Sequence, residues 1–236
     1  MDYLLSGVIG YLLGSVSCGL LLVKLICGID IRDYGSHNIG ATNVFRTVGA
    51  RMASFVLLGD LLKGVLALYL VNHYVSSDLT VLILCATCAI LGHSFSWMCG
   101  FKGGKGVATG LGILLYFMPE VAVFALTIWL ATVFVTRYVS LGSILAALAA
   151  PFSAWYLGYD GWLVAFVGLC AAVVVARHYQ NMIRLKNGTE SKIRQGHWKK
   201  RQGCERIHTP VAGLGSRIAA KGAVAQATVP FLMQRS

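Results

Sequence analysis

Apolar runs separated by short polar segments constrain this chain more than any other feature of its sequence. The first three are long enough to cross a bilayer, whose hydrocarbon core requires about 20 helical residues. The later four are shorter and form two pairs, interrupted at 119–120 and at 159–161 by residues that favour turns. With 57% hydrophobic and 12% charged residues, the chain also lacks the polar surface of a soluble domain. The runs span 3–27, 54–75, 79–98, 107–118, 121–136, 144–158 and 162–176.

The distribution of Lys and Arg selects a topology. If every run crosses the membrane and the N-terminus lies outside, the outward connections are 76–78, 119–120 and 159–161, which contain no basic residue. The inward connections then carry the basic loop residues, as the positive-inside rule requires, and merging either pair of short runs would break this pattern. The sequence therefore predicts an all-α integral membrane protein with seven transmembrane helices, the N-terminus outside and the C-terminus cytoplasmic.

The C-terminal part of the chain differs in composition from the rest. Residues 191–236 hold nine of the 20 Lys and Arg residues but only one of the nine acidic residues. Such basic segments are attracted to anionic lipid headgroups, and no nucleic-acid recognition motif accompanies this one. We therefore expect a membrane domain over 1–194 and a basic cytoplasmic extension over 195–236, surface-associated or disordered. Its partners would be membrane lipids and not nucleic acid.

The cysteines do not indicate a metal site. The stretch "CATC" at 85–88 has the spacing of a metal-binding or redox pair, but it lies inside a predicted span and has no second pair. Small residues in such a place are typical of close helix packing in membranes. We expect no metal and no cofactor.

The first inward segment, 31–49, is unusually rich in polar groups for a loop. Its hydroxyl, amide and guanidinium groups suit a phosphate or a polyhydroxyl ligand, while an ordinary solvated loop is the alternative. The candidate residues are Ser36, Asn38, Thr42, Asn43 and Arg46.

The second inward segment reads "GFKGGKGVATG" at 100–110. It is not a nucleotide-binding P-loop, because Gly106 replaces the Ser or Thr that would bind Mg²⁺. Its glycines predict a nest of backbone N–H groups leading into a helix that begins near Val107, whose N-terminus attracts an anion. A basic anchor loop is the alternative, although an anchor does not need the glycines. The candidates are Lys102, Gly103, Gly104, Lys105 and Gly106.

The third inward region combines 137–143 with 177–190. His178, Asn181 and Arg184 recur on one face of a helix that leaves the membrane. The histidine could act as a base, as a donor to an oxyanion, or only as an interfacial residue. Arg137 and Ser143 complete the candidates of this region.

Three further polar residues lie within the predicted spans. Asp60 and Lys63, three residues apart, can pair with each other or face the site, and His93 lies just before the glycine-rich segment. Because charged groups inside a membrane are costly, we expect Asp60 and Lys63 to have a function.

Three parts of the chain resemble, in order and spacing, the signature regions of the bacterial acyl-phosphate:glycerol-3-phosphate acyltransferase family (PlsY). They are "GSHNIGATNVFRTVG", "GHSFSWMCGFKGGKGVATGLG", and "RYVSLGSI" with "RHYQNMIRLKNGTE", and the resemblance covers residues 5–194. It implies a seven-span enzyme of the bacterial inner membrane, with its active site facing the cytoplasm. It also implies transfer of a fatty acyl group from acyl phosphate to the 1-hydroxyl of glycerol 3-phosphate, without a metal. The products would be lysophosphatidic acid and inorganic phosphate, in phospholipid biosynthesis. We expect a monomer.

The resemblance implies a role for most of the candidate residues. Lys105 would neutralise the donor phosphate, and Arg46 one of the two phosphates. His178, with Asn181 and Ser143, would orient glycerol 3-phosphate, and either His178 or a substrate phosphate oxygen would take the hydroxyl proton. We thus expect catalytic roles for Ser36, Arg46, Lys105, Ser143, His178 and Asn181, and substrate binding by Asn38, Thr42, Asn43, Lys102, Gly103, Gly104, Gly106, Arg137 and Arg184.

His37 departs from the family pattern, which usually has glycine at this position. If the backbone there needs a positive φ, histidine is tolerated but less comfortable than glycine. We expect activity to survive this difference.

A transporter or channel for a phosphorylated solute is the main alternative function. It would place polar groups near the bilayer midplane between repeats. The candidates here gather at one face, and no internal repeat is visible. A membrane scaffold gives no reason for the clustered polar residues, and a lipid phosphatase or a different acyltransferase would use the same cluster.

Overall fold

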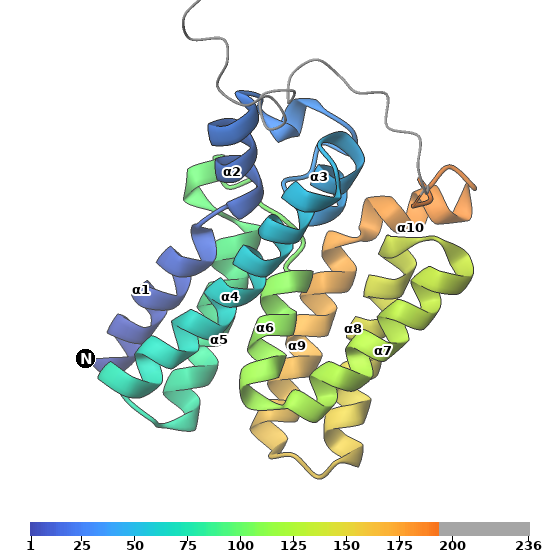
Figure 1. Cartoon of the computed structure of the whole chain (residues 1–236). Coiled ribbons are helices and arrows are strands. Elements are labelled where there is room, and N and C mark those ends of the chain that lie inside the picture. Colours follow the sequence, from blue (N-terminus) through green and yellow to red (C-terminus); the bar gives the residue numbers. More distant parts are fainter. Residues whose placement is uncertain (194–236) are drawn as a thin grey trace, which may run out of the picture. The chain divides into compact units, whose positions relative to one another are not determined.

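Within residues 1–193, which the computed structural model describes, the regular elements are all helices (Figure 1). The predicted basic extension, 195–236, lies outside these residues. The N-terminal helices are α1 (Asp2–Ser15), α2 (Cys18–Cys27), α3 (Ala41–Thr47), α4 (Ala50–Tyr74) and α5 (Leu79–Ser94). The others are α6 (Val107–Phe117), α7 (Pro119–Thr136), α8 (Val139–Tyr156), α9 (Gly161–Arg177) and α10 (Tyr179–Lys186), and short 3-10 turns occupy Ile31–Asp33 and Trp97–Cys99.

Five helical stretches among the described residues are long and apolar enough to cross a membrane. They are α1 with α2, α4, α5 with its following turn, α7 and α8. The pair α9 and α10, bent by 56°, gives a sixth if the two count as one span. The prediction of an all-helical, multi-pass membrane protein is therefore confirmed.

The remaining predicted span, 107–118, forms the short helix α6. Its 11 residues correspond to about 16 Å of helix, roughly half the thickness of a hydrocarbon core. A Cβ atom at Gly112 would lie 2.1 Å from the carbonyl oxygen of Leu61, and one at Gly64 would lie 2.7 Å from that of Thr109. These glycines let α6 touch the backbone of α4 near its middle, so α6 begins part-way along α4 and not level with the first residue of α4 (Figure 1).

Helices α1 and α5 are also in backbone contact. A Cβ atom at Gly10 would lie 2.3 Å from the carbonyl oxygen of Cys85, and one at Gly14 would lie 2.1 Å from that of Ala89. Small residues of this kind bring membrane helices close together. Cys85 is fully buried at this contact, which agrees with the packing role expected for the "CATC" stretch.

The break between α1 and α2 exposes two backbone carbonyls inside the bundle. The hydroxyl of Ser96 donates to the carbonyl of Ser15 at 2.6 Å, and the ammonium of Lys63 donates to that of Val16 at 2.7 Å. Side chains from α4 and the loop after α5 thus satisfy groups that a membrane would otherwise leave without partners.

The polar segments share one end of the bundle. Figure 1 shows the N-terminus, the α4–α5 connection and the α8–α9 connection at the lower end. The loop before α3, α3 itself and α10 lie at the upper end. The first and third predicted inward segments therefore meet on the same side.

The backbone contact between α1 and α5 predicts opposite effects for two glycine substitutions. Gly14→Ala should lower the free energy of unfolding by about 1–3 kcal/mol, because its methyl group collides with the Ala89 carbonyl. Gly168→Ala is the matched control, since nothing lies within 4 Å of a Cβ atom there, and it should be neutral or stabilising. Thermal unfolding in detergent would measure both, and equal effects would contradict the packing described.

Candidate active site

A cavity of about 260 Å³ lies where the three predicted polar segments meet. Its lining includes residues of α3 and the loop before it, the start of α6, and parts of α7, α8, α9 and α10. Five of the predicted site residues do not line this cavity: Lys102, Gly103, Gly104, Arg137 and Arg184. The predicted site residues that do are Ser36, Asn38, Thr42, Asn43, Arg46, Lys105, Gly106, Ser143, His178 and Asn181.

The loop before α3 is folded around the side chain of Asn43. Its Oδ1 accepts the N–H of Ser36 at 2.8 Å, and its Nδ2 donates to the carbonyls of Tyr34 and Asn38 at 2.9 and 2.8 Å. Asn43 is 1% exposed, so its amide is occupied by the loop and not free for a ligand. We therefore reassign Asn43 from substrate binding to holding Ser36 and Asn38 at the cavity.

His37 lies on this loop with φ at 58°. Its Nδ1 lies 2.8 Å from the carbonyl oxygen of Arg32, so Nδ1 donates and the exposed ring helps to hold the turn. The backbone at this position, where the family usually has glycine, therefore does have a positive φ in this chain, a conformation that histidine adopts less readily than glycine.

Two glycines of the glycine-rich segment do not offer free N–H groups to the expected nest. The N–H groups of Gly103 and Gly104 donate to the carbonyls of Ser94 and His93, at 3.1 and 3.0 Å. Their own carbonyls accept from Arg177, at 2.9 Å for Gly103 and at 3.0 and 3.1 Å for Gly104. These two glycines pack against the end of α5 and do not bind a ligand through their N–H groups.

The start of α6 is the stronger candidate for an anion site. The helix begins at Val107, as predicted, after Gly106 with φ at 80°, and no described side chain caps it. Gly106, Val107 and Ala108 line the cavity. The first N–H groups of a helix have no intrahelical partner, and they attract an anion together with the helix dipole.

Lys105 belongs to a chain of polar contacts that reaches α8. Its Nζ donates to Asn181 Oδ1 at 2.6 Å, and Asn181 Nδ2 donates to Glu190 Oε1 at 2.7 Å. The same carboxylate accepts from Ser140 Oγ and from Arg184 Nε, both at 2.8 Å. Arg184 thus acts on the site through Glu190 and not by lining the cavity.

Glu190 and Ser140 carry no role in the sequence prediction. The signal that could have found Glu190 is that it is the only acid in the basic stretch 177–190. Burial alone would raise the pKa of Glu190, but hydrogen bonds from Arg184, Asn181 and Ser140 outweigh it and lower the pKa. A buried anion at this position holds Asn181, and Asn181 in turn holds Lys105.

The cationic groups of the cavity are partly desolvated. Burial lowers the pKa of Lys105 to about 8, against a weaker opposite effect of Glu190. Burial also lowers the pKa of Arg46, whose Nη2 donates to the carbonyl of Ser191 at 2.8 Å. Arg46 Nε is buried and without a hydrogen-bond partner in the described part of the chain. Both side chains would be stabilised by an anion in the cavity.

His178 lies at the bend between α9 and α10 and is 2% exposed. Its Nδ1 is 2.8 Å from the carbonyl oxygen of Val174. Because a carbonyl can only accept, Nδ1 carries the proton, and the Nε2 of the neutral ring keeps a lone pair. His178 is therefore suited to accept a hydrogen bond or a proton from a hydroxyl group.

Ser143 is already engaged by its neighbours. Its Oγ donates to the carbonyl of Val139 at 2.9 Å and accepts from Trp129 Nε1 at 3.2 Å. One further lone pair remains, so Ser143 can only accept from a ligand in this arrangement.

The rest of the cavity wall is apolar. Side chains of α6, α7, α8 and α9 form it, including Ile113, Leu126, Ala150, Phe166 and Val167. The cavity thus joins a positively charged end to a surface that suits a hydrocarbon chain.

The chain is similar to known glycerol-3-phosphate acyltransferases. A family model described as "Glycerol-3-phosphate acyltransferase" matches residues 4–188. A protein of that name from Syntrophomonas wolfei is 46% identical over 187 residues, covering 79% of this chain and 94% of the relative. A second one, from Fusobacterium nucleatum, is 41% identical over 189 residues, covering 79% and 96%.

Two solved structures are similar to the chain in fold. Both are crystal structures of PlsY (YgiH), an integral membrane glycerol 3-phosphate acyltransferase. The glycerol 3-phosphate form has a TM-score of 0.78 at 36% identity, and the lysophosphatidic acid form 0.76 at 34%. Each comparison covers 82% of this chain and 96% of the other.

The position of Glu190 leads to a stability prediction. Glu190→Gln replaces an acceptor of three hydrogen bonds by an amide whose NH₂ group faces donors, so the free energy of unfolding should fall by about 1–3 kcal/mol. Glu120→Gln is the matched control: Glu120 is exposed, and the amide oxygen of Gln can still accept the hydrogen bond from the Tyr159 hydroxyl, so stability should change by less than about 0.5 kcal/mol. Thermal unfolding would compare them, and a Glu190→Gln protein as stable as the control would contradict the role given to Glu190.

Proposed function

This chain belongs to the glycerol-3-phosphate acyltransferase family, and we propose that it transfers a fatty acyl group from acyl phosphate to the 1-hydroxyl of glycerol 3-phosphate. The products are lysophosphatidic acid and inorganic phosphate, and the reaction serves phospholipid biosynthesis. The names of the two similar structures support glycerol 3-phosphate as one substrate and lysophosphatidic acid as the product.

The observation that carries the proposal is the combination of two surfaces in one cavity. The polar end holds Lys105, Arg46 and the uncapped start of α6, and the rest of the wall is apolar. An acyl phosphate has a doubly charged head and a hydrocarbon chain joined directly, so it matches this division. A bulky carrier on the acyl group is not needed to explain any described residue.

The proposed reaction relies on positioning and on electrostatic stabilisation. Acyl phosphate is already activated, so no covalent enzyme intermediate is needed. Lys105 and the N-terminus of α6 hold the donor phosphate, and Arg46 holds one of the two phosphates. The glycerol hydroxyl oxygen bonds to the acyl carbon, the bond from that carbon to the phosphate oxygen breaks, and phosphate leaves.

The proton of the attacking hydroxyl has two possible acceptors. His178 Nε2 has a free lone pair because Nδ1 donates to Val174, so it can orient the hydroxyl or take its proton. A substrate phosphate oxygen is the other acceptor. Asn181 holds the Lys105 ammonium at 2.6 Å and so keeps the charge beside the leaving phosphate.

We further propose seven crossings, with the N-terminus outside and the cavity open to the cytoplasm, in the bacterial inner membrane. In this topology α6 forms the short crossing, and the glycine-rich segment before it leads into α6 from the cytoplasmic side. We also propose that the protein acts as a monomer.

Phosphate release by the purified protein in lipid tests the proposed donor. Palmitoyl phosphate with glycerol 3-phosphate should release phosphate and form lysophosphatidic acid, whereas palmitoyl-CoA should not replace the donor. Lys105→Ala should lower kcat/KM by about 10²–10³-fold, the usual loss for a removed electrostatic group. Release without glycerol 3-phosphate would indicate a hydrolase, and activity with palmitoyl-CoA would refute the proposed donor.

The pKa of Lys105 predicts the alkaline limb of the pH profile. Lys105 is protonated below its pKa of about 8, so kcat/KM for palmitoyl phosphate should fall as the pH rises through about 8. Lys105→Arg keeps its charge to much higher pH, so its profile should stay flat over this range even if its activity is lower. The rate of phosphate release without enzyme is subtracted at each pH. If kcat/KM fell equally in the wild type and in Lys105→Arg, the loss of activity at high pH would belong to another group.

A further inference from the structure

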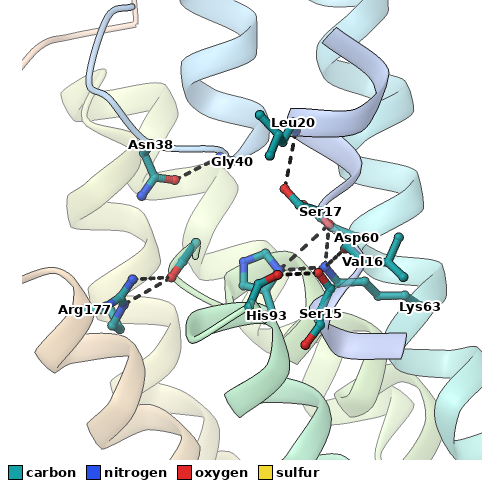
Figure 2. A network of polar contacts seen from close by, with 12 residues as sticks. Ser15, Val16, Ser17, Leu20, Asn38, Gly40, Asp60, Lys63, His93 and Arg177 are labelled. Carbon is teal, nitrogen blue, oxygen red and sulfur yellow. Dashed lines mark hydrogen bonds and ion pairs between the residues drawn. The ribbon is translucent and has the colours of Figure 1, made fainter. Parts of the chain in front are cut away.

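Asp60, Lys63 and His93 form a buried cluster at the cavity, each at most 6% exposed, and Asp60 and His93 are part of the cavity wall. Lys63 Nζ donates to the carbonyl of Val16 at 2.7 Å and to Asp60 Oδ1 at 2.8 Å, and it lies 2.8 Å from His93 Nδ1 (Figure 2). An ammonium has three protons, and these three acceptors use all of them. Lys63 therefore has no donor left for a substrate.

The contact with Lys63 determines the tautomer and orientation of His93. An ammonium has no lone pair, so His93 Nδ1 must accept and the ring proton lies on Nε2. Asp60 Oδ1 is 3.9 Å from the same Nδ1, on the side of the ring that faces Lys63. The opposite side of the imidazole, with Nε2 and Cε1, faces the glycine-rich segment.

The ring of His93 packs directly on Gly104. A Cβ atom at Gly104 would lie 2.2 Å from His93 Nε2 and 2.9 Å from Cε1, so no larger residue fits there. The N–H of Gly104 also donates to the carbonyl of His93 at 3.0 Å. On the other side, Arg177 at the end of α9 donates to the carbonyls of Gly103 and Gly104. The segment that leads into Lys105 is thus held between α5 and α9.

We propose that His93 is a positioning residue for the phosphate site, and that the Lys63–Asp60 ion pair acts through it. The ion pair holds the imidazole of His93 in place. The imidazole and the backbone carbonyl of His93 then hold Gly104, and Gly104 in turn determines the positions of Lys105 and the start of α6. None of the three residues touches the reacting atoms in this scheme. The inference deepens the proposed function and rests on it, because it assumes that Lys105 binds the donor phosphate.

The physical reason for the cluster is the freedom of the glycines. A segment with three glycines in four residues has many conformations of similar energy, so a lysine attached to it needs support from outside. Apolar packing alone would be less costly than a buried ion pair in a membrane. The pair instead gives a directional contact, which sets the angle of the ring against Gly104.

A double-mutant cycle between His93 and Gly104 tests the inference. His93→Asn keeps an acceptor for Lys63 but removes the part of the ring that touches Gly104, and Gly104→Ala adds the methyl group that collides with it. Each should lower kcat/KM for palmitoyl phosphate by about 10²-fold, the loss that a displacement of about 1 Å can cause. The double variant should be no worse than His93→Asn alone, because the shorter side chain leaves room for the methyl group.

Losses that multiply in the double variant would overturn the inference, as would full activity of His93→Asn. His73→Ala and Gly168→Ala are the matched controls and should keep wild-type rates, since neither position lines the cavity. Each variant is first shown to be folded by thermal unfolding, and His93→Ala replaces His93→Asn should the latter not fold. His93→Gln places a polar group near the position of Nε2, so it should keep part of the activity that His93→Asn loses.

A second measurement separates this inference from the proposed function. An amine-reactive reagent labels Lys105 only when its amine is deprotonated, and mass spectrometry gives the pH at which labelling is half-maximal. This midpoint does not depend on which reaction the protein catalyses. It should rise in His93→Asn, because a displaced Lys105 becomes more solvated, and an unchanged midpoint would count against the inference. A wild-type protein without acyltransferase activity would refute the proposed function, and the labelling would still decide the role of His93.

Discussion

A helix that begins inside a bundle of other helices, away from the ends of the bundle, leaves its first N–H groups without an intrahelical partner. Helix α6 begins in this way at Val107, next to α4 near its middle and with no described side chain as a cap. Its N-terminus and Lys105 together make a positive region beside an apolar wall. An anion with a hydrocarbon chain would satisfy both, and this is the basis on which we propose an acyl phosphate as the donor.

The rest of the bundle keeps that helix end in place. Gly64 and Gly112 bring α4 and α6 into backbone contact, which sets the depth of the start of α6. The segment before it is held by the end of α5 and by Arg177 from α9. Glu190 holds Asn181, which holds the Lys105 ammonium. The hydrogen bonds among these contacts satisfy polar groups that lie inside the bundle.

Much of the architecture could be predicted from the sequence, because hydropathy and charge act over whole segments. The run at 54–75 became α4 with bounds Ala50–Tyr74, and the start of α6 was placed correctly at Val107. The meeting of the three polar segments was also expected, since their basic residues had to share one face. The pairing of Asp60 with Lys63 was one of two alternatives, and the structure contains it at 2.8 Å.

Individual hydrogen bonds could not be predicted in the same way. Asn43 and Gly104 look like ligand-binding groups in the sequence, but both are used by the loops that carry them. Glu190 acts through contacts with residues nine and fifty positions away, and no periodicity reveals the second of these. His93 lies near the glycine-rich segment in sequence, yet its contact with Lys63 depends on how α4 and α5 pack.

The measurement that tests the central claim most directly is a structure of the protein with an acyl phosphonate, a donor analogue whose phosphorus cannot leave. The account places the phosphonate oxygens within hydrogen-bond distance of Lys105 Nζ and of the first N–H groups of α6, with the chain along the apolar wall. A phosphonate bound elsewhere in the cavity, with the start of α6 in contact with no anion, would contradict it.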